Sequence, residues 1–461
     1  MRPRIAIYGG SFSPPGQHHR RIAELLAREF DRVIVVPCGP RPDKQVATSV
    51  DPIYRAAMTD IAFRGLRNVD VELFDLEQAT FTRTHDLETR FASRGDLWHV
   101  VGTDLVAGGR EGQSFIHRVW ERGPELWRTL RFAVVNRRGH EAGPGDLPPQ
   151  HRLVNAELEG SSFHIREMLF RREEIRHCVS PEIAAYIERQ GLYCGTFPRR
   201  VTKHAFKDGL RPLLAYDERN PKAVAWAREF EKHGNHDEPN CILVFGGDGS
   251  MLHAIQKHWR KRVPFFGINA GHLGFLLNDY RRVVEEGFPD AEIVLRQMPM
   301  LYVEMQAPDG SWRDMLTFND AWVERKSGQT AWLGIKVNGQ TRIEKMVCDG
   351  VLVSTAAGST AYARAMGATP LLADTPAWLL AGSNVLTPAH WKSALLSMDA
   401  SVEIESLDYA KRPLQGYVYG VEMGEVRGMR ARVSRIAAAE LAFCANHDMA
   451  EKIAHIQFPR A

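Results

Sequence analysis

The sequence predicts an α/β protein in two parts, a parallel α/β unit followed by a second α/β unit that continues into an antiparallel β-rich region. Three observations lead to this prediction. An apolar strand runs into glycines and then a helix twice, around 9–10 and around 246–249. Apolar and polar residues alternate around Asp309-Gly310 and around Asn338-Gly339, which is typical of β-hairpins. The length of 461 residues suits roughly two to four domains.

Composition and charge exclude several classes of protein. With 44% hydrophobic and 25% charged residues, the chain is not mainly disordered, collagen-like or a heptad repeat. Lys+Arg number 59 and Asp+Glu 56, a balance that favours neither nucleic-acid nor membrane binding. Six scattered cysteines show no zinc or disulfide spacing, so we expect no metal held by the protein alone. No apolar run approaches the roughly 20 residues that span a bilayer, and we expect a cytoplasmic protein.

In the first part, strands and helices alternate as in a parallel sheet. The expected strands are 5–8, 31–37, 69–76, 97–102 and 131–136. The expected helices are 20–30, 85–92, a Trp-rich stretch that includes Trp120 and Trp127, and 180–190. The last helix begins at Ser180-Pro181 and stops at Gly191, so we place the first domain at 1–193. The two tryptophans are expected to pack in the core.

Residues 194–208 combine Gly, Pro and basic residues without apolar periodicity, which predicts an exposed linker. The second domain, 209–461, then opens with strand 211–217, helix 222–234, strand 241–245 and a glycine loop. We divide it into an α/β part at about 209–295, a β-rich part at about 296–435 and a closing segment at 436–461. The stretch 447–458 in that segment could return to either layer.

The glycines at 9–10 follow a strand and precede a helix, where bare backbone N–H groups can hold phosphate oxygens. Alone, they fit a plain turn as well. Together, the stretches GGSFSPPGQHH (9–19), PCGPRPDK (37–44), VGTD (101–104) and GSSFHIREML (160–169) resemble the nicotinate/nicotinamide mononucleotide adenylyltransferases. This resemblance covers most of the first domain. It implies a Rossmann-like nucleotidyltransferase domain that joins a mononucleotide to the AMP part of ATP, releasing pyrophosphate.

The same resemblance implies the residues of the first site. His19 is the expected catalytic histidine, which contacts the ATP phosphates. The other expected nucleotide contacts are Gly9, Gly10, Ser11, Phe12, Lys44, Gly102, Asp104, Ser161, Ser162 and Arg166. Two of these contacts have plain alternatives: Asp104 as a helix cap, and Arg166 as a surface ion pair.

The chain departs from the family loop, G-G-[ST]-F-x-P-x-H-x-G-H, at two positions. Gly16 stands where the first histidine is usual, and His18 stands where the glycine is usual. Losing one of two such contacts would lower the rate by about 10²- to 10³-fold. On a helix, His18 would point about 200° away from residue 16, so we expect a solvated histidine that does not compensate. Asp43 also replaces a histidine that usually precedes the basic residue Lys44.

The second glycine loop, CILVFGGDGSMLHA at 241–254, is more specific. Its glycines let the backbone close on phosphates, and its aspartate can orient a hydroxyl or help to hold Mg²⁺, which predicts phosphoryl transfer. Such a loop is shared by NAD kinases, 6-phosphofructokinases and lipid kinases. Three further stretches, at 266–276, 318–325 and 349–367, resemble the NAD kinases in order and spacing. This resemblance implies transfer of the ATP γ-phosphoryl group to the adenosine ribose 2′-hydroxyl of NAD, giving NADP, with Mg²⁺ or another divalent cation.

The kinase resemblance also implies site residues. Asp248 is the expected catalytic aspartate. The phosphate contacts are Gly246, Gly247, Gly249 and Ser250, and the NAD contacts are Asn269, Phe275, Asn319, Asp320, Thr360, Ala361 and Tyr362. A plain β-turn is the alternative for Asn319-Asp320, and core packing for Tyr362. The chain departs from the kinase pattern at Ala356-Ala357, Ala368 and Gln415-Gly416, and we expect these departures to alter affinity or substrate preference before they abolish the reaction. The resemblance also implies at least a dimer.

The leading hypothesis is a bifunctional enzyme whose first domain makes the dinucleotide that its second domain phosphorylates. One alternative keeps the kinase and treats the first domain as a degenerate nucleotide-binding module, because of Gly16. Another is a non-catalytic NAD(P) sensor or scaffold. The expected partners are small molecules, namely ATP, NAD and a mononucleotide. Nicotinate versus nicotinamide, and ATP versus polyphosphate, stay open.

Overall fold

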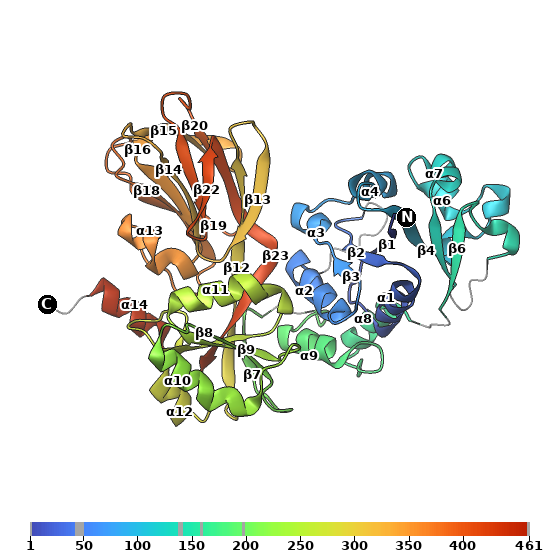
Figure 1. Ribbon diagram of the computed structural model, residues 1–461, viewed down its shortest axis with the longest axis horizontal. Coiled ribbons are helices and arrows are strands. Elements are labelled where there is room, and N and C mark those ends of the chain that lie inside the picture. Colours follow the sequence, from blue (N-terminus) through green and yellow to red (C-terminus); the bar gives the residue numbers. More distant parts are fainter. Residues whose placement is uncertain (1, 42–49, 137–141, 157–159, 196–198, 459–461) are drawn as a thin grey trace. The chain divides into compact units, whose positions relative to one another are not determined.

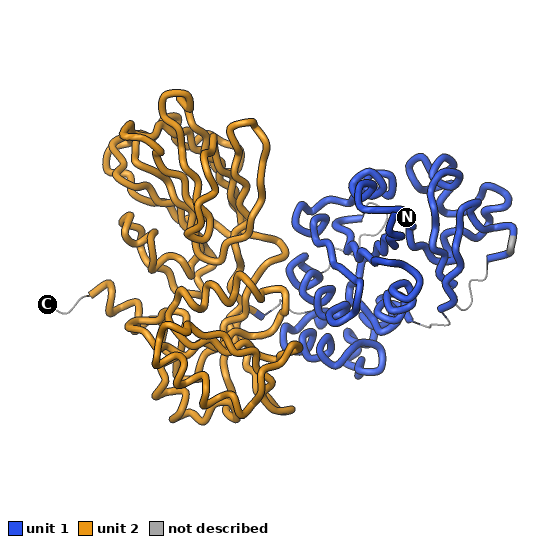
Figure 2. The backbone as a smooth tube through the Cα atoms, viewed as in Figure 1, with its two compact units in different colours: residues 1–199 blue, residues 200–461 orange. Residues whose placement is uncertain are grey.

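The chain divides into two compact units, residues 1–199 and 200–461 (Figure 2). The computed structural model describes residues 2–41, 50–136, 142–156, 160–195 and 199–458. The division falls inside the segment 194–208, which was expected to be an exposed linker. Part of that segment, Val201–His204, is instead strand β7, which pairs antiparallel with Ile293–Arg296. Its pairing uses backbone groups, so its basic side chains carried no apolar pattern that could predict it.

The first unit is built on one six-stranded parallel sheet (Figure 1). Its strands are β1 Arg4–Gly10, β2 Arg32–Pro37, β3 Val69–Val71, β4 Asp96–Gly102, β5 Phe132–Asn136 and β6 His151–Asn155. The order β3-β2-β1-β4-β5-β6, with every pair parallel, is that of a doubly wound Rossmann sheet. The Rossmann-like fold expected for this part is therefore confirmed.

Helices cover both faces of this sheet, which is why its central strands are continuously apolar. They are α1 Gln17–Glu29, α2 Pro52–Phe63, α3 Phe74–Gln78, α4 Thr84–Phe91, α5 Thr103–Val106, α6 Phe115–Val119, α7 Gly123–Thr129, α8 Ser162–Phe170 and α9 Pro181–Gln190. Ala6 and Tyr8 of β1 pack in one core with α1, α2 and α9, whereas Ile5 and Ile7 pack in another with α4.

Two predictions in the first unit were wrong. The expected strand 69–76 is a three-residue strand, β3, followed by helix α3. Strand β6 was missed, because only Val154 of its five residues is buried and an edge strand with one buried residue has no period. The helix 180–190 is confirmed, with Ser180 capping its start and Gly191 its left-handed end.

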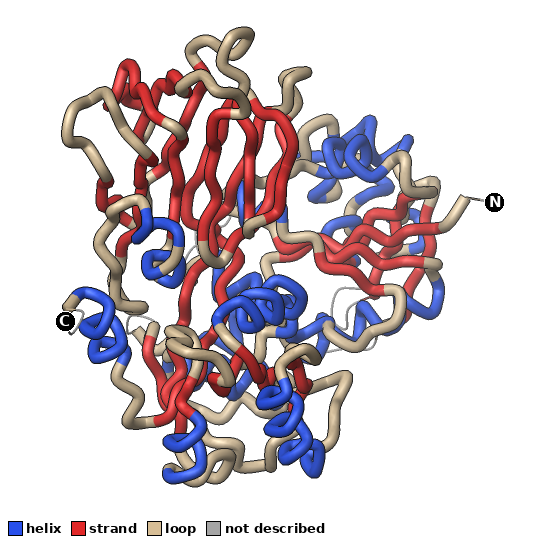
Figure 3. Tube along the Cα trace, turned by 60° about the vertical axis from the view of Figure 1, so that its left-hand side comes forward, coloured by secondary structure: helices blue, strands red, loops and turns tan. Residues whose placement is uncertain are grey.

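The second unit begins as α/β and becomes β-rich. Figure 3 shows most of its helices in one half, whereas strands run through both halves. Its strands after β7 are β8 Pro212–Tyr216, β9 Cys241–Gly246, β10 Phe265–Asn269, β11 Asn278–Asp279, β12 Ile293–Gln306, β13 Trp312–Thr317, β14 Asp320–Arg325, β15 Ala331–Val337, β16 Gln340–Cys348, β17 Gly350–Ser354, β18 Ala377–Ser383, β19 Ser393–Ser397, β20 Ser401–Ser406, β21 Leu414–Val418, β22 Val421–Val426 and β23 Gly428–Cys444. Its helices are α10 Pro221–Phe230, α11 Asp248–His258, α12 Tyr280–Glu285, α13 Tyr362–Ala365 and α14 Met449–Gln457.

Strands β8, β9 and β10 are parallel, and they belong to an 11-stranded sheet that is antiparallel further along. Strands β14, β17, β18, β19, β21 and β22 form a separate antiparallel sheet. The long strands β12 and β23 pair with each other from Ile293↔Cys444 to Gln306↔Gly428. They run through both the α/β and the β-rich halves, so the boundaries expected at 295/296 and 435/436 fall inside strands.

Both hairpin predictions are confirmed. Gln306 pairs with Trp312 across Asp309-Gly310, and Val337 pairs with Gln340 across Asn338-Gly339. Asn338 and Gly339 have φ of 52° and 72°, as a two-residue type I′ turn requires. The helices of the described chain include none with the length and apolarity needed to cross a bilayer.

Candidate functional sites

The first unit has a cleft at the carboxyl ends of β1 and β4, where the strand order reverses. Parallel sheets bind ligands at this position. The cleft measures about 1310 Å³, more than the roughly 300–1,000 Å³ of a pocket for one small molecule. Its lining includes the expected residues Gly9, Gly10, Ser11, Phe12, His19, Gly102, Asp104, Ser161, Ser162 and Arg166. Lys44 lies outside the described residues.

Two side chains fix the loop after β1. Phe12 packs against it, and Arg55, which the sequence did not predict, donates hydrogen bonds to it. Phe12 is 1% exposed, and a β-carbon on Gly10 would lie 2.9 Å from its ring, so glycine is needed there. The buried guanidinium of Arg55 donates to the carbonyls of Ser11 and Cys38, each at 2.7 Å. A lone arginine among the apolar residues of α2 was the signal that could have revealed this role.

The start of α8 is tied to the same loop. Ser161 caps the helix by accepting from the Phe163 N–H at 3.1 Å, and the Ser162 hydroxyl donates to the Pro14 carbonyl at 2.8 Å. Arg166 donates to the Ser13 carbonyl at 2.6 Å, and burial lowers the pKa of its guanidinium. Arg166 is thus anchored at the cleft. Asp104 is exposed inside the short α5, whose first position is preceded by Gly102, so Asp104 is not the cap.

The two histidines at the start of α1 lie side by side, with ring centres 3.9 Å apart. His19 Nδ1 accepts the Gly16 N–H at 3.0 Å. The prediction that His18 faces solvent was wrong, because His18 is 7% exposed and lines the cleft. Gly16 has an extended backbone, with φ of −93° and ψ of 171°, and lies just before the helix. The expected angle of about 200° between residues 16 and 18 assumed that both are helical, so it does not apply.

The tryptophans divide between core and cleft. Trp127 is buried in a core cluster, as expected. Trp120 is half-buried, packs 6.4 Å from Phe132 and also lines the cleft.

In the second unit, Asp248 begins α11 directly after the glycines that end β9. Its carboxylate accepts the N–H groups of Phe275, at 3.0 Å, and Leu276, at 2.8 Å. Burial raises the pKa of Asp248, while these two N–H groups and the charge of Lys452 oppose the rise. Glycine at 246 is required, because a β-carbon there would lie 2.2 Å from Ser250 Oγ. A β-carbon added to Gly247 or to Gly249 would meet no atom of the described residues within 4 Å, so both present open backbone.

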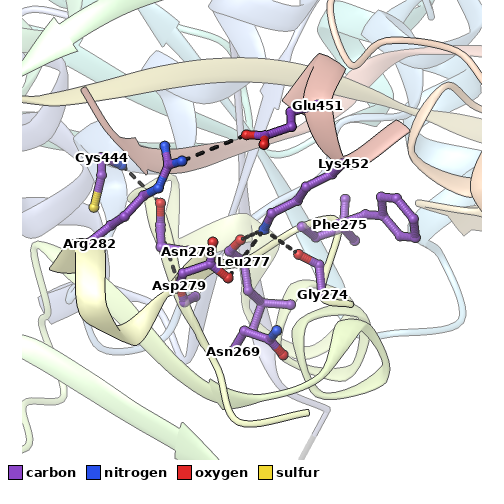
Figure 4. A network of polar contacts seen from close by, with 12 residues as sticks. Asn269, Gly274, Phe275, Leu277, Asn278, Asp279, Arg282, Cys444, Glu451 and Lys452 are labelled. Carbon is purple, nitrogen blue, oxygen red and sulfur yellow. Dashed lines mark hydrogen bonds and ion pairs between the residues drawn. The ribbon is translucent and has the colours of Figure 1, made fainter. Parts of the chain in front are cut away.

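The loop that holds Asp248 is organised by Asn269 and by Lys452 of α14. Asn269 pairs with Gly246 in the sheet, and its Oδ1 accepts the Gly271 N–H at 2.9 Å. Lys452 Nζ donates to the carbonyls of Gly274, at 2.9 Å, and Leu277, at 2.8 Å (Figure 4). The sequence analysis missed Lys452, because a single lysine in an amphipathic segment is not distinctive.

The predicted NAD residues in the β-rich region also come together. The Thr355 N–H donates to the Asn319 carbonyl at 2.8 Å, and a β-carbon on Gly358 would lie 2.7 Å from that oxygen. The 3-10 turn Ala357–Thr360 therefore packs on Asn319, and Ala361 and Tyr362 follow it into α13. Tyr362 is 37% exposed, edge-on to Trp322 at 5.2 Å, and is not a core residue.

Two polar side chains here are buried. Asn319 Oδ1 is buried and has no hydrogen-bond partner among the residues that the structure describes. Asp320 is 7% exposed, and burial raises its pKa to about 6. Buried polar groups are normally paired, so both indicate a ligand surface.

Tyr419, which the sequence did not predict as a site residue, connects the residues around Asp248 with those around Asp320. Its N–H donates to the Asp320 carbonyl at 3.3 Å, and its hydroxyl donates to the Leu252 carbonyl of α11 at 2.7 Å. The helix that begins at Asp248 and the strand that begins at Asp320 are thus joined.

Within the part of the chain that the structure describes, no three His, Cys, Asp or Glu side chains are grouped closely enough to hold a metal ion.

Comparisons with known proteins match the two parts of the chain to two different families. Residues 7–176 match the cytidylyltransferase-like family, and residues 166–285 match the ATP-NAD kinase N-terminal domain. The NAD kinase of Rickettsia bellii is 30% identical over 250 residues, which cover 53% of this chain and 96% of that protein. The NAD kinase of Rickettsia felis is 32% identical over 252 residues, with the same coverage.

The chain belongs to the NAD kinase family. A solved structure of yeast NADH kinase complexed with NADH matches with 16% identity and a TM-score of 0.46, covering 57% of this chain and 92% of that one. The expected fusion of a nucleotidyltransferase-like unit with an NAD kinase is confirmed. The kinase match begins inside α8 of the first unit, although the second compact unit begins at Arg200.

Proposed function

We propose that this NAD kinase is bifunctional. Its second unit would transfer the γ-phosphoryl group of ATP to the adenosine ribose 2′-hydroxyl of NAD, giving NADP and ADP. Its first unit would make the dinucleotide from ATP and nicotinate or nicotinamide mononucleotide. The observation that carries the kinase proposal is the buried Asp248 carboxylate, held by two amides at the start of α11.

Asp248 can orient the hydroxyl that attacks. A carboxylate has about four acceptor positions, and the N–H groups of Phe275 and Leu276 use one on each oxygen. The positions that are left can accept the 2′-hydroxyl. The hydroxyl oxygen then bonds to the γ-phosphorus, the bond from that phosphorus to the β-phosphate oxygen breaks, and the hydroxyl proton passes to Asp248 or to water. Mg²⁺ bound with ATP would neutralise charge on the phosphates.

Several polar groups would hold NAD in this proposal. The unpartnered Oδ1 of Asn319 can accept from a ribose hydroxyl or an amide N–H, and the Asp320 carboxylate can do the same when ionised. The backbone of Thr360 and Ala361 and the exposed ring of Tyr362 lie on the adjoining turn, and Asn269 and Phe275 lie on the loop beside Asp248. Gly246, Gly247, Gly249 and Ser250 would face the phosphates at the helix start.

In the first unit, the mononucleotide phosphate would attack the α-phosphorus of ATP directly. The new P–O bond forms as the bond to the β-phosphate oxygen breaks, and pyrophosphate leaves without a protein nucleophile. The support for this proposal is that one cleft collects the open glycines after β1, the start of α8 and Arg166. Nitrogen donors in these positions would neutralise charge on the triphosphate.

The decisive experiment uses the full-length protein and an Asp248→Asn variant. Given NAD, ATP and Mg²⁺, the variant should form NADP about 10²-fold or more slowly than the wild type, because the oriented anion is lost. Given a mononucleotide, it should release pyrophosphate as the wild type does, which shows that the first unit is intact, and an unchanged circular dichroism spectrum would show that the second unit is folded. NADP formation by Asp248→Asn at the wild-type rate would contradict the kinase mechanism. Absence of pyrophosphate release from the wild type would leave the first unit as a binding module only.

A further inference from the structure

His18 occupies an unusual position for a residue at the exposed start of a helix. It is the second residue of α1, yet only 7% of it is exposed. Its ring lies beside that of His19, with the two planes at 39° and the centres 3.9 Å apart. Both rings line the cleft of the first unit together with Ser161 and Arg166.

Two glycines from separate segments make room for this ring. A β-carbon on Gly16 would lie 2.6 Å from His18 Cε1 and Nδ1, and a β-carbon on Gly160 would lie 2.4 Å from Nδ1. Real β-carbons do not approach other atoms so closely. The imidazole of His18 therefore fills the volume that side chains at 16 and 160 would take, and it is fixed from both sides.

The neighbouring ring has a defined proton position. His19 Nδ1 accepts the Gly16 N–H, so in the neutral ring the proton is on Nε2, which is a donor. Two imidazoles in contact repel each other when both are protonated, unless an anion lies against them. Arg166, anchored on the Ser13 carbonyl, adds a cation at the same cleft. A polyanion is the ligand that would suit this grouping.

We propose that His18 binds the phosphate chain of the nucleotide donor together with His19, and so supplies the imidazole that position 16 lacks. This inference rests on the adenylyl transfer proposed for the first unit and names one of the residues that perform it. Gly16 is then no sign of degeneration, because the imidazole reaches its place from residue 18. The glycine at 16 is what allows it to do so.

The proposal predicts a specific pattern among four full-length proteins. His18→Ala removes the imidazole, and Gly16→His places a second ring where His18 already lies, so each should release pyrophosphate from ATP and mononucleotide about 10²-fold more slowly. The double variant, Gly16→His with His18→Gly, removes the clash and returns a ring to the cleft. It should recover most of the wild-type rate. His164→Ala, at an exposed histidine of α8, is the matched control and should have no effect.

NADP formation from added NAD, measured in the same samples, reports that the second unit is intact and should not change, while recovery in the double variant shows that substitutions at 16 and 18 leave the first unit folded. A wild-type rate in His18→Ala, or no recovery in the double variant, would overturn the proposal. If the wild type itself releases no pyrophosphate, adenylyl transfer fails as the function, and calorimetric binding of ATP to the first unit's cleft then decides the role of His18. His18→Ala and His164→Ala chains are compared, because ATP binding to the unchanged second unit is the same in both. Weaker binding in His18→Ala alone supports the phosphate contact, and equal binding in both overturns it.

Discussion

At the scale of single residues, Asp320 is the clearest case in which binding and stability oppose each other. Its carboxyl is 7% exposed, and burial is the cause that raises its pKa from 3.8 to about 6. The ionised form is therefore disfavoured in the folded protein without ligand. Its retention at this position fits a role in holding NAD, where hydrogen-bond donors of the ligand would compensate the charge.

We predict that Asp320→Asn stabilises the ligand-free protein at neutral pH and weakens NAD binding. Because the folded pKa is raised, the folded state binds more protons than the unfolded state between pH 3.8 and about 6. The contribution of Asp320 to the free energy of unfolding therefore falls as pH rises through that window, and the loss is complete above it. Removing the charge should regain on the order of 3 kcal/mol at neutral pH and almost nothing at the acid end.

Urea unfolding of the wild type and the variant, measured from about pH 3.8 to neutral pH, checks the predicted change in stability. The KM for NAD, measured alongside, checks the change in binding. Asp314→Asn, at an exposed position of β13, is the control and should change stability by less than about 0.5 kcal/mol at every pH. A variant that is equally destabilised at all pH values would show that Asp320 is held by hydrogen bonds instead.

Residues also show where sequence reasoning succeeds and where it stops. Asp248 and Arg166 could be placed because each sits in a local pattern of glycines or serines next to a helix start, and the structure puts them there. Arg55, Tyr419 and Lys452 could not, because each acts on a segment far away in the sequence through one or two long-range hydrogen bonds. His18 was misplaced because an ideal helix was extended one residue too far, to Gly16.

At the scale of elements, hydrogen bonds link Asp248 to the loop 274–277, and link that loop to the helix α14. The N–H groups of Phe275 and Leu276 hold the carboxylate, and the carbonyls of Gly274 and Leu277 are held by Lys452 (Figure 4). Burial lowers the pKa of Lys452, with the nearby charges of Asp279 and Asp248 opposing this. The closing helix is therefore part of the candidate kinase site.

We predict that Lys452→Met lowers kcat/KM of NADP formation by roughly tenfold or more, since charged hydrogen bonds contribute about 1.5–3 kcal/mol. The charge of Lys452 also lowers the pKa of Asp248, so its loss should move the acid limb of the kinase pH profile to higher pH. A purely structural role would not move that limb.

Glu451→Gln is the matched control on the same helix. Glu451 is 60% exposed and lies 3.8 Å from Arg282, a surface pair that contributes at most about 1 kcal/mol. Its variant should keep both the rate and the pH profile of the wild type. An unchanged pH profile in Lys452→Met would contradict the electrostatic part of the prediction.

Among the elements, those with local signals were predicted best. The hairpin at Asn338-Gly339 and the helix from Ser180 to Gly191 are determined by the conformational demands of a few residues. Other elements depend on partners distant in sequence. These are strands β6 and β7, and the pairing of β12 with β23, which extends through both halves of the second unit. Short edge strands and long-range pairing leave no period in the sequence.

At the scale of the whole molecule, the chain combines two units whose proposed reactions share one compound. The dinucleotide that the first unit is proposed to make belongs to the substrate class proposed for the second. Covalent fusion supplies the two units in equal amounts, but it does not by itself pass a compound from one site to the other. Diffusion of a small molecule between dissolved sites is fast compared with enzyme turnover, which is typically 1–10³ per second.

We therefore predict that the dinucleotide is released before it is phosphorylated. Full-length protein given labelled nicotinamide mononucleotide, ATP and Mg²⁺ should form labelled NADP after a lag, and an excess of unlabelled NAD should dilute the label in NADP accordingly. A mixture of Asp248→Asn and His19→Ala chains, each with one intact unit, should form NADP at the rate set by the concentrations of intact units. Labelled NADP that resists dilution in the wild type, together with a slow mixture, would instead require direct transfer within one chain, because only a retained intermediate escapes exchange with the pool.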